Sequence, residues 1–138
     1  MTARAAPQAA GSSVPQEGVP EAVARLRHEL RRRGIDLVYC ADGAAALEFL
    51  LSRIPAGATV MNGGSHTLVQ IGLLAALADG PYQWLRPPIK TLDDAGERTR
   101  ARRRATTADC YFGGINAITE RGEILNADGA GTRVSAYA

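Results

Sequence analysis

The sequence predicts an α/β fold with a mostly parallel sheet flanked by helices. Segments with helical periodicity alternate with short apolar runs, an order that is typical of strands joined by crossover helices. The 138 residues fit a single domain. Hydrophobic residues make up 46% of the chain, which is ordinary for a globular protein. Residues 1–19 are rich in Ala, Pro, Ser and Gln, so we expect a disordered tail there and an α/β domain over residues 20–138.

The first predicted helix begins at Pro20, a favourable first-turn residue, and ends at Gly34. Val23, Leu26 and Leu30 recur at the spacing of one apolar helix face. The elements expected next are a strand over residues 35–40, a helix that Asp42 would cap and that carries residues 46–51, and a strand over residues 58–62.

The second half is predicted to continue with a long helix after Thr67 that runs through Leu77. Residues 81–96 contain Pro-Pro and Asp-Asp pairs and are expected to be irregular. The remaining expected elements are an Arg-rich helix over 97–106, a strand over 109–112, a hairpin of 117–119 and 123–126 turning at 121–122, and a final strand over 133–137.

The first candidate site follows the strand that ends near residue 62 and reads Asn-Gly-Gly-Ser-His-Thr-Leu over residues 62–68. Gly63 and Gly64 would let the backbone approach a ligand, and a helix N-terminus favours an anion. Ser65 or Thr67 would cap the helix or bind an oxygen of the ligand, and an ordinary capped turn remains the alternative. His66 is a candidate catalytic residue, but no spacing of ligands around it predicts a metal site.

The second candidate site lies in residues 109–133, where polar groups and glycines are dense after a strand. Ligands bind beyond the carboxyl ends of the strands in open α/β sheets, so these polar side chains are expected to converge there. Because Asn and Asp also serve turns, a structural role for each of them remains open. The candidates are Asn116 and Glu120 for catalysis, with Asn126, Asp128 and Arg133 for ligand binding.

Two stretches carry a resemblance to a known family. Residues 63–73 read Gly-Gly-Ser-His-Thr-Leu-Val-Gln-Ile-Gly-Leu, and residues 116–120 read Asn-Ala-Ile-Thr-Glu. Gly-Glu at 122–123, Asp-Gly at 128–129 and Gly-Thr-Arg-Val at 131–134 follow in the order of the same family. Over residues 20–138 the chain resembles the LUD domain of the lactate-utilisation protein C type.

That resemblance implies the fold shared by glucosamine-phosphate deaminases, ribose-phosphate isomerases and CoA transferases, the NagB/RpiA/CoA-transferase-like fold. It also implies a part in oxidising L-lactate to pyruvate together with iron–sulfur partner proteins. The two cysteines, Cys40 and Cys110, are too few to ligate such a cluster, so we expect no cofactor in this chain and the redox centres in its partners.

The chain departs from the family pattern at three places. Gln70 stands where Glu is usual, and Thr132 stands where Asn is usual beside Arg133. Relatives also continue beyond the position of Ala138, so the chain looks C-terminally short. If residues 134–137 form an open sheet edge, we expect self-association.

The alternative function is a stand-alone enzyme or binding domain for a small phosphorylated or carboxylated metabolite. Isomerase chemistry of the methylthioribose-phosphate type is disfavoured, because Asn116 stands where those enzymes carry an Asp and an amide transfers no proton. Nucleic-acid binding by the Arg-rich helix is disfavoured against a solvated face, since the net charge is only +2. Without an apolar run of membrane-spanning length or an apolar leader segment, a cytoplasmic protein is expected.

Overall fold

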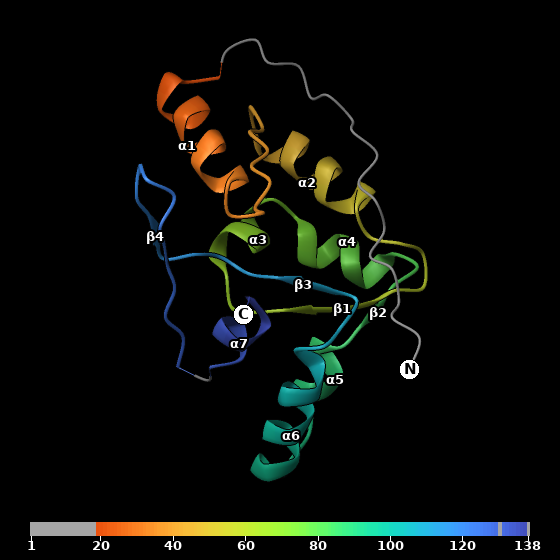
Figure 1. Ribbon diagram of the computed structural model, residues 1–138. Coiled ribbons are helices and arrows are strands. Elements are labelled where there is room, and N and C mark those ends of the chain that lie inside the picture. Colours follow the sequence, from red (N-terminus) through yellow and green to blue (C-terminus); the bar gives the residue numbers. More distant parts are fainter. Residues whose placement is uncertain (1–18, 130, 138) are drawn as a thin grey trace, which may run out of the picture. The chain divides into compact units, whose positions relative to one another are not determined.

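A computed structural model describes residues 19–129 and 131–137 of the chain (Figure 1). The predicted disordered tail lies outside the described residues except for Val19. The chain divides into two compact units, residues 1–39 and residues 40–138, and each is described by itself.

The described part of the first unit is a helix followed by an extended segment. Helix α1 spans Glu21–Arg31 and begins directly after Pro20. Gly34 has a φ of 73° and stops the helix, and the Ile35 amide donates to the Leu30 carbonyl across this turn. The predicted strand over residues 35–40 is wrong: the segment is extended but pairs with no strand among the described residues. An apolar run becomes a strand only where a neighbour accepts its backbone hydrogen bonds.

The second unit is built on a three-stranded parallel sheet, which confirms the predicted fold class. The central strand β1, Thr59–Asn62, pairs with β2, Gln83–Trp84, on one side and with β3, Cys110–Phe112, on the other. At the start of the sheet the Asp109 carboxylate accepts the Thr59 amide at 3.0 Å and the Thr59 hydroxyl at 2.7 Å. This pair of bonds fixes the register of β1 against β3.

Helices cover both faces of this sheet (Figure 1). Alternate residues of β1 serve the two faces, since Val60 belongs to one buried cluster and Met61 to the other. The Val60 cluster is covered by α2 (Gly43–Ser52), α3 (His66–Gln70) and α4 (Leu73–Asp79). The Met61 cluster is covered by α5 (Arg86–Lys90) and α6 (Ala95–Ala105).

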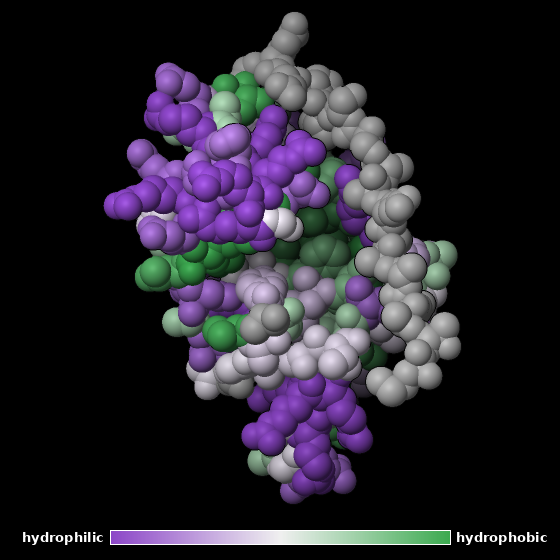
Figure 2. Space-filling model, in the orientation of Figure 1, coloured by the Kyte–Doolittle hydropathy of each residue, from purple (hydrophilic) through white to green (hydrophobic). Residues whose placement is uncertain are grey.

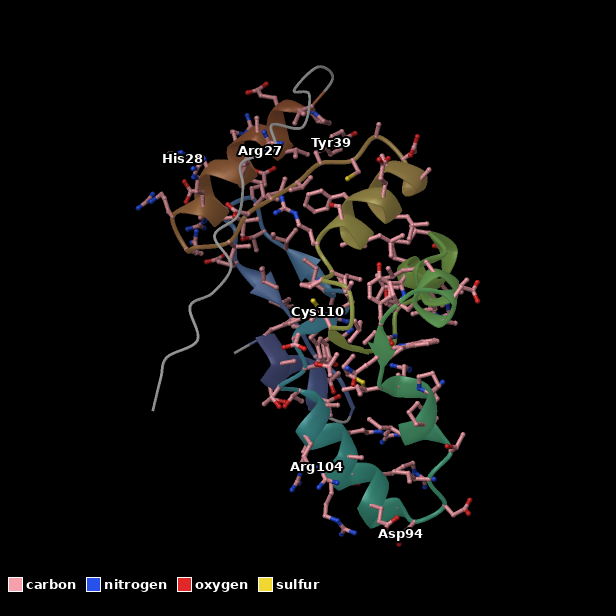
Figure 3. All side chains as sticks on the ribbon, turned by 90° about the vertical axis from the view of Figure 1, so that its right-hand side faces the viewer. Arg27, His28, Tyr39, Asp94, Arg104 and Cys110 are labelled. Atoms are coloured by element: carbon pink, nitrogen blue, oxygen red, sulfur yellow. The ribbon has the colours of Figure 1, made fainter. Side chains whose placement is uncertain are left out.

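Two of these helices begin at carboxylates that cap them. The Asp42 carboxylate accepts the Ala45 amide at 2.8 Å, as its predicted capping role requires. The Asp94 carboxylate accepts the Glu97 amide at 2.6 Å and starts the Arg-rich helix α6. Figure 3 shows Asp94 at the beginning of α6 and Arg104 extending outward from the same helix.

Residues 66–79 form two helices rather than the single long helix that the apolar spacing predicts. Gly72 separates α3 from α4 and has a φ of 82°, a left-handed conformation that interrupts helical hydrogen bonding. The chain changes direction there, so that Leu68 of α3 and Leu73 and Leu77 of α4 all enter the same buried cluster.

Residues 81–96 are ordered as β2 and α5, contrary to the predicted irregular segment. The strand has only two residues and the helix starts with two prolines in its first turn, so neither produces a periodic pattern.

The last segment holds the predicted hairpin and a helix that replaces a predicted strand. Strands β4, Ala117–Ile118, and β5, Ile124–Leu125, pair antiparallel and confirm the hairpin. The final strand over 133–137 is wrong, because Thr132–Tyr137 forms the short helix α7. One oxygen of Asp128 accepts the amides of Arg133 and Val134, each at 3.0 Å, and thereby satisfies the start of this helix. The expected sheet edge at residues 134–137 is therefore absent.

No helix in the described part of the chain has the length and apolar character needed to cross a bilayer.

Candidate functional site

The carboxyl ends of β1 and β2 open a crevice because their connections leave toward opposite faces of the sheet. After β1 the chain enters α3 and α4 on the Val60 face, and after β2 it enters α5 and α6 on the Met61 face. Neighbouring parallel strands whose connections diverge in this way create the crevice in which open α/β sheets bind ligands. Elementary topology therefore places a site at residues 62–64 and 85–86.

A cavity of about 430 Å³ occupies this position. Its walls come from the end of β1, from α5 and α6, and from the turn and first residues of α7. The lining residues are Met61, Asn62, Gly63, Gly64, Arg86, Ile89, Lys90, Arg102, Asp128, Gly129, Thr132 and Arg133.

The charge of this pocket is strongly positive. Four cationic side chains line it against a single carboxylate, that of Asp128, whose Oδ2 already accepts two amides of α7. The pocket therefore attracts anions. The cations are Arg86, Lys90, Arg102 and Arg133.

Arg133 is held in place by the residues that follow the hairpin. Its Nη2 donates to the carbonyl of Ala127 and to Oδ1 of Asn116, the latter at 3.3 Å. The same Asn116 oxygen accepts the Ala127 amide at 2.9 Å. The Nε of Arg133 is buried and has no hydrogen-bond partner among the described residues.

Asn62 fixes the floor of the pocket. Its side chain is 2% exposed, its Oδ1 accepts the indole N–H of Trp84 at 2.8 Å, and its Nδ2 donates to the Gly63 carbonyl at 3.0 Å. The backbone carbonyl of Asn62 accepts Nη1 of Arg86 at 2.6 Å. These bonds lock the ends of β1 and β2 together and direct Arg86 along the crevice.

The two glycines at the end of β1 differ in what they contribute. The Gly63 amide donates to the Phe112 carbonyl at 2.8 Å, and a Cβ on Gly63 would lie 3.3 Å from the Tyr111 hydroxyl and 3.7 Å from Cδ of Arg133. Gly64 has open space around it. Gly63 therefore allows close approach of the Tyr111 hydroxyl, while Gly64 lines the pocket without a close neighbour.

The other predicted residues of the glycine motif lie outside the pocket lining. Ser65 caps α3, because its hydroxyl oxygen accepts the Leu68 amide at 3.4 Å. His66 and Thr67 are exposed on the first turn of that short helix.

The predicted residues of the second motif separate into two groups. Asp128 and Arg133 line the pocket, and Asn116 reaches it through its bond to Arg133. Glu120 is exposed at the turn of the hairpin and is not among the lining residues. Asn126 does not line the pocket either, but both polar atoms of its amide are buried without a hydrogen-bond partner among the described residues.

Sequence reasoning missed three of the four pocket cations. Arg86 directly follows β2, a position that would have indicated a site if this two-residue strand had been recognisable. Arg102 was expected on a solvated face, and most of α6 does carry hydrophilic residues at the surface (Figure 2). Arg102 reaches the pocket only because α6 packs against α5, and no sequence pattern near Arg102 predicts that packing.

Two aromatic rings lie near Arg133, and a cysteine lies in the sheet. The rings of Tyr111 and Tyr137 meet edge to face with centroids 5.9 Å apart, and the Tyr111 hydroxyl is buried without a hydrogen-bond partner among the described residues. Burial, followed by the neighbouring Tyr111, raises the pKa of Tyr137, while Arg133 lowers it in part. Burial, and secondly the charge of Asp109, raises the pKa of the Cys110 thiol, which lies within the sheet (Figure 3).

Metal-binding side chains do not gather in this structure. Among the described residues, no three His, Cys, Asp or Glu side chains form a group that could hold a metal ion.

The fold and the pocket define an α/β domain with a cationic pocket at the carboxyl end of its central strand. Comparison with family models gives a match to the LUD domain over residues 23–138. Since the match spans most of the sequence, the chain belongs to the LUD domain family. No curated protein and no solved structure matched the chain.

Proposed function

We propose that this LUD domain binds a small carboxylate or phosphate metabolite in the pocket at the end of β1. We further propose that it acts as a non-redox component of L-lactate oxidation, with iron–sulfur partner proteins carrying the electrons. The observation that carries the binding proposal is the pocket itself, in which four cations face one carboxylate that is already hydrogen-bonded to the backbone. Family membership supports the link to lactate utilisation.

Arg133 is the residue best suited to hold a carboxylate. Guanidinium and carboxylate groups form paired, charge-assisted hydrogen bonds, which are stronger than neutral ones and fix the orientation of the ligand. The bonds from Arg133 to Asn116 and Ala127 occupy Nη2 and hold the guanidinium, so little side-chain freedom is lost when a ligand binds. In this proposal Asn116 is a positioning residue for Arg133.

The test of the anion site compares Arg133→Met with Arg121→Met. Both variants remove one guanidinium, but Arg121 is exposed at the hairpin turn and does not line the pocket. Titration calorimetry with inorganic phosphate and with L-lactate should show binding to the wild type and to Arg121→Met. For Arg133→Met we expect at least a tenfold loss of affinity for L-lactate, because charged hydrogen bonds contribute about 1.5–3 kcal/mol.

Equal affinity of both variants for L-lactate would contradict this assignment. Circular dichroism of each variant checks that a loss of binding is not a loss of folding.

The proposed role in lactate oxidation needs a separate experiment. The chain is co-expressed with candidate iron–sulfur lactate-utilisation proteins, and the purified assembly is mixed with L-lactate. We expect the chain to copurify with them, and we expect lactate to reduce their clusters in its presence only. Copurification without any effect of lactate, or no copurification at all, would argue against this role.

A stand-alone enzyme or binding domain for a phosphorylated or carboxylated metabolite is the second candidate. The observation that favours it is the size and charge of the pocket, which exceed what a three-carbon monocarboxylate needs. Tight binding of a phosphorylated ligand by the chain alone, combined with no copurification, would select this alternative.

A further inference from the structure

The pocket has two cationic walls that come from different parts of the chain. The first wall is formed by the glycines after β1 and by Arg133 at the start of α7. The second wall carries Lys90 at the end of α5 and Arg102 on α6. Arg86 lies at the base and is bonded to the backbone of Asn62. One anionic group can be bound by one wall and would leave the other without a counter-charge.

The second wall is a firmly built part of the structure. Helices α5 and α6 share a buried cluster in which Ile89 and Ala105 pack with Met61 of β1. Ile89 precedes Lys90 directly, and Ile89 and Lys90 both line the pocket. The Asp94 cap at the start of α6 and the bond from Arg98 to the Leu92 carbonyl hold the connection between the two helices. The packing therefore fixes the helix positions from which Lys90 and Arg102 line the pocket.

The volume of the pocket agrees with a ligand that reaches both walls. At about 430 Å³ it falls within the range of metabolite sites, which is roughly 300–1,000 Å³. A three-carbon acid on Arg133 would leave much of this space to water. A ligand that carries a second anionic group would fill the pocket and neutralise Lys90 and Arg102.

We infer that the ligand of this pocket carries two anionic groups, a carboxylate bound at Arg133 and a phosphate monoester bound at Lys90 and Arg102. This inference rests on the proposed anion site and specifies its substrate class. A phosphate monoester carries about −1.5 to −2 charges at neutral pH, which matches the two cations of the second wall. Lys binds phosphate as a point charge and Arg binds it through paired donors. Lys90 and Arg102 together therefore suit the tetrahedral oxygens of a phosphate group.

Three related probes test the two ends of the ligand separately. They are 3-phosphoglycerate, which carries both groups, glycerate, which carries the carboxylate alone, and glycerol 3-phosphate, which carries the phosphate alone. Titration calorimetry should give an affinity for 3-phosphoglycerate at least tenfold higher than for either of the other two.

A pair of neighbouring arginines on α6 provides a matched control. Arg102→Gln and Arg103→Gln make the same change at adjacent positions of one helix, but only Arg102 lines the pocket. Arg102→Gln should weaken 3-phosphoglycerate and glycerol 3-phosphate at least fivefold and leave glycerate unchanged. Arg103→Gln should leave all three affinities unchanged.

The possible outcomes distinguish this inference from the proposed function. If glycerate or glycerol 3-phosphate binds as tightly as 3-phosphoglycerate, the two-group ligand is overturned while the anion site stands. If Arg102→Gln lowers the affinity for glycerate as much as for the phosphorylated probes, the assignment of the second wall is overturned. If the wild type binds none of the three probes, nor phosphate or lactate, the anion site falls together with the inference.

Discussion

At the scale of single residues, the site depends on positions where a side chain is absent. A Cβ on Gly113 would collide with the Tyr137 hydroxyl and would lie 3.1 Å from Cδ of Arg133. A Cβ on Gly63 would press on the Tyr111 hydroxyl at 3.3 Å and would touch the same arginine at an ordinary contact distance. The glycines after β1 and β3 therefore give the guanidinium of Arg133 its place beside the sheet.

We expect Gly113→Ala to lower the free energy of unfolding by about 1–3 kcal/mol, because overpacking forces neighbouring side chains to move. Urea unfolding measures this change. Gly64→Ala is the control for stability, since a Cβ there meets no atom within 4 Å. Adding Tyr137→Phe to Gly113→Ala removes the hydroxyl that collides and should restore most of the loss. A double variant as unstable as Gly113→Ala would disprove this account.

The Cys110 thiol should react slowly with alkylating reagents. Burial, and to a lesser degree Asp109, raises the pKa of this thiol, and only the thiolate is nucleophilic. In a Cys40→Ser variant, the rate of alkylation by iodoacetamide should therefore rise at higher pH than in the same protein unfolded in guanidinium chloride. An equal or lower midpoint in the folded protein would contradict the raised pKa.

At the scale of elements, the break between α3 and α4 shows how one glycine shapes the core. The Gly72 φ of 82° is strained for any residue with a Cβ, while the space around it is ordinary, with Cδ2 of Leu47 at 3.7 Å from a built Cβ. The role of Gly72 is therefore a matter of backbone conformation and not of packing.

Gly72→Ala should reduce stability by about 1–2 kcal/mol, the usual cost of a left-handed conformation for an L-residue. Chemical unfolding measures it, with Gly129→Ala as the control, because Gly129 has neither a positive φ nor a neighbour within 4 Å. If Gly72→Ala is as stable as the wild type, α3 and α4 can join into one helix and the break is not required.

Some elements could be predicted from the sequence, and others could not, because they depend on contacts between distant residues. Periodicity, capping residues and a turn glycine predict four elements correctly: α1, α2, α6 and the hairpin. α7 was mistaken for a strand, because its first turn depends on the Asp128 carboxylate several residues earlier. The expected strand over 35–40 has apolar character but no partner in the described sheet. The local residue pattern indicates whether a segment can form a strand, but the tertiary structure decides whether a neighbouring strand pairs with it.

The candidate site was predictable only in part. The glycines after β1 and Arg133 were recognisable from their place after strands and from the family pattern. Lys90 and Arg102 reach the pocket only because α5 and α6 pack together, and that packing is a property of the assembled domain. His66 and Glu120 are candidate catalytic residues in the sequence, yet both are exposed and neither lines the pocket.

At the scale of the whole molecule, the free protein stores electrostatic repulsion in the pocket. Four cations share a space of about 430 Å³, and like charges at close range destabilise the folded state. Ligands that bind only the folded protein stabilise it, by about 2.7 kcal/mol when the free ligand is at 100 times its dissociation constant.

Inorganic phosphate should therefore raise the melting temperature more than chloride does at equal ionic strength. The comparison separates specific binding from general screening of charge. In Arg102→Gln the difference between the two salts should shrink markedly. Equal melting temperatures of the wild type in phosphate and in chloride would indicate that the pocket does not select this anion.

The origin of the two walls in separate stretches of chain has an evolutionary consequence. Residues 86–105 supply the second wall, whereas Arg133 and the residues that orient it lie within 116–133. Changes within α5 and α6 can alter the distal group that a ligand must carry without disturbing the hold on its carboxylate. We expect LUD domains that diverge in the first stretch to accept different metabolites on a common acid-binding platform, so that new specificity can arise there without a new fold.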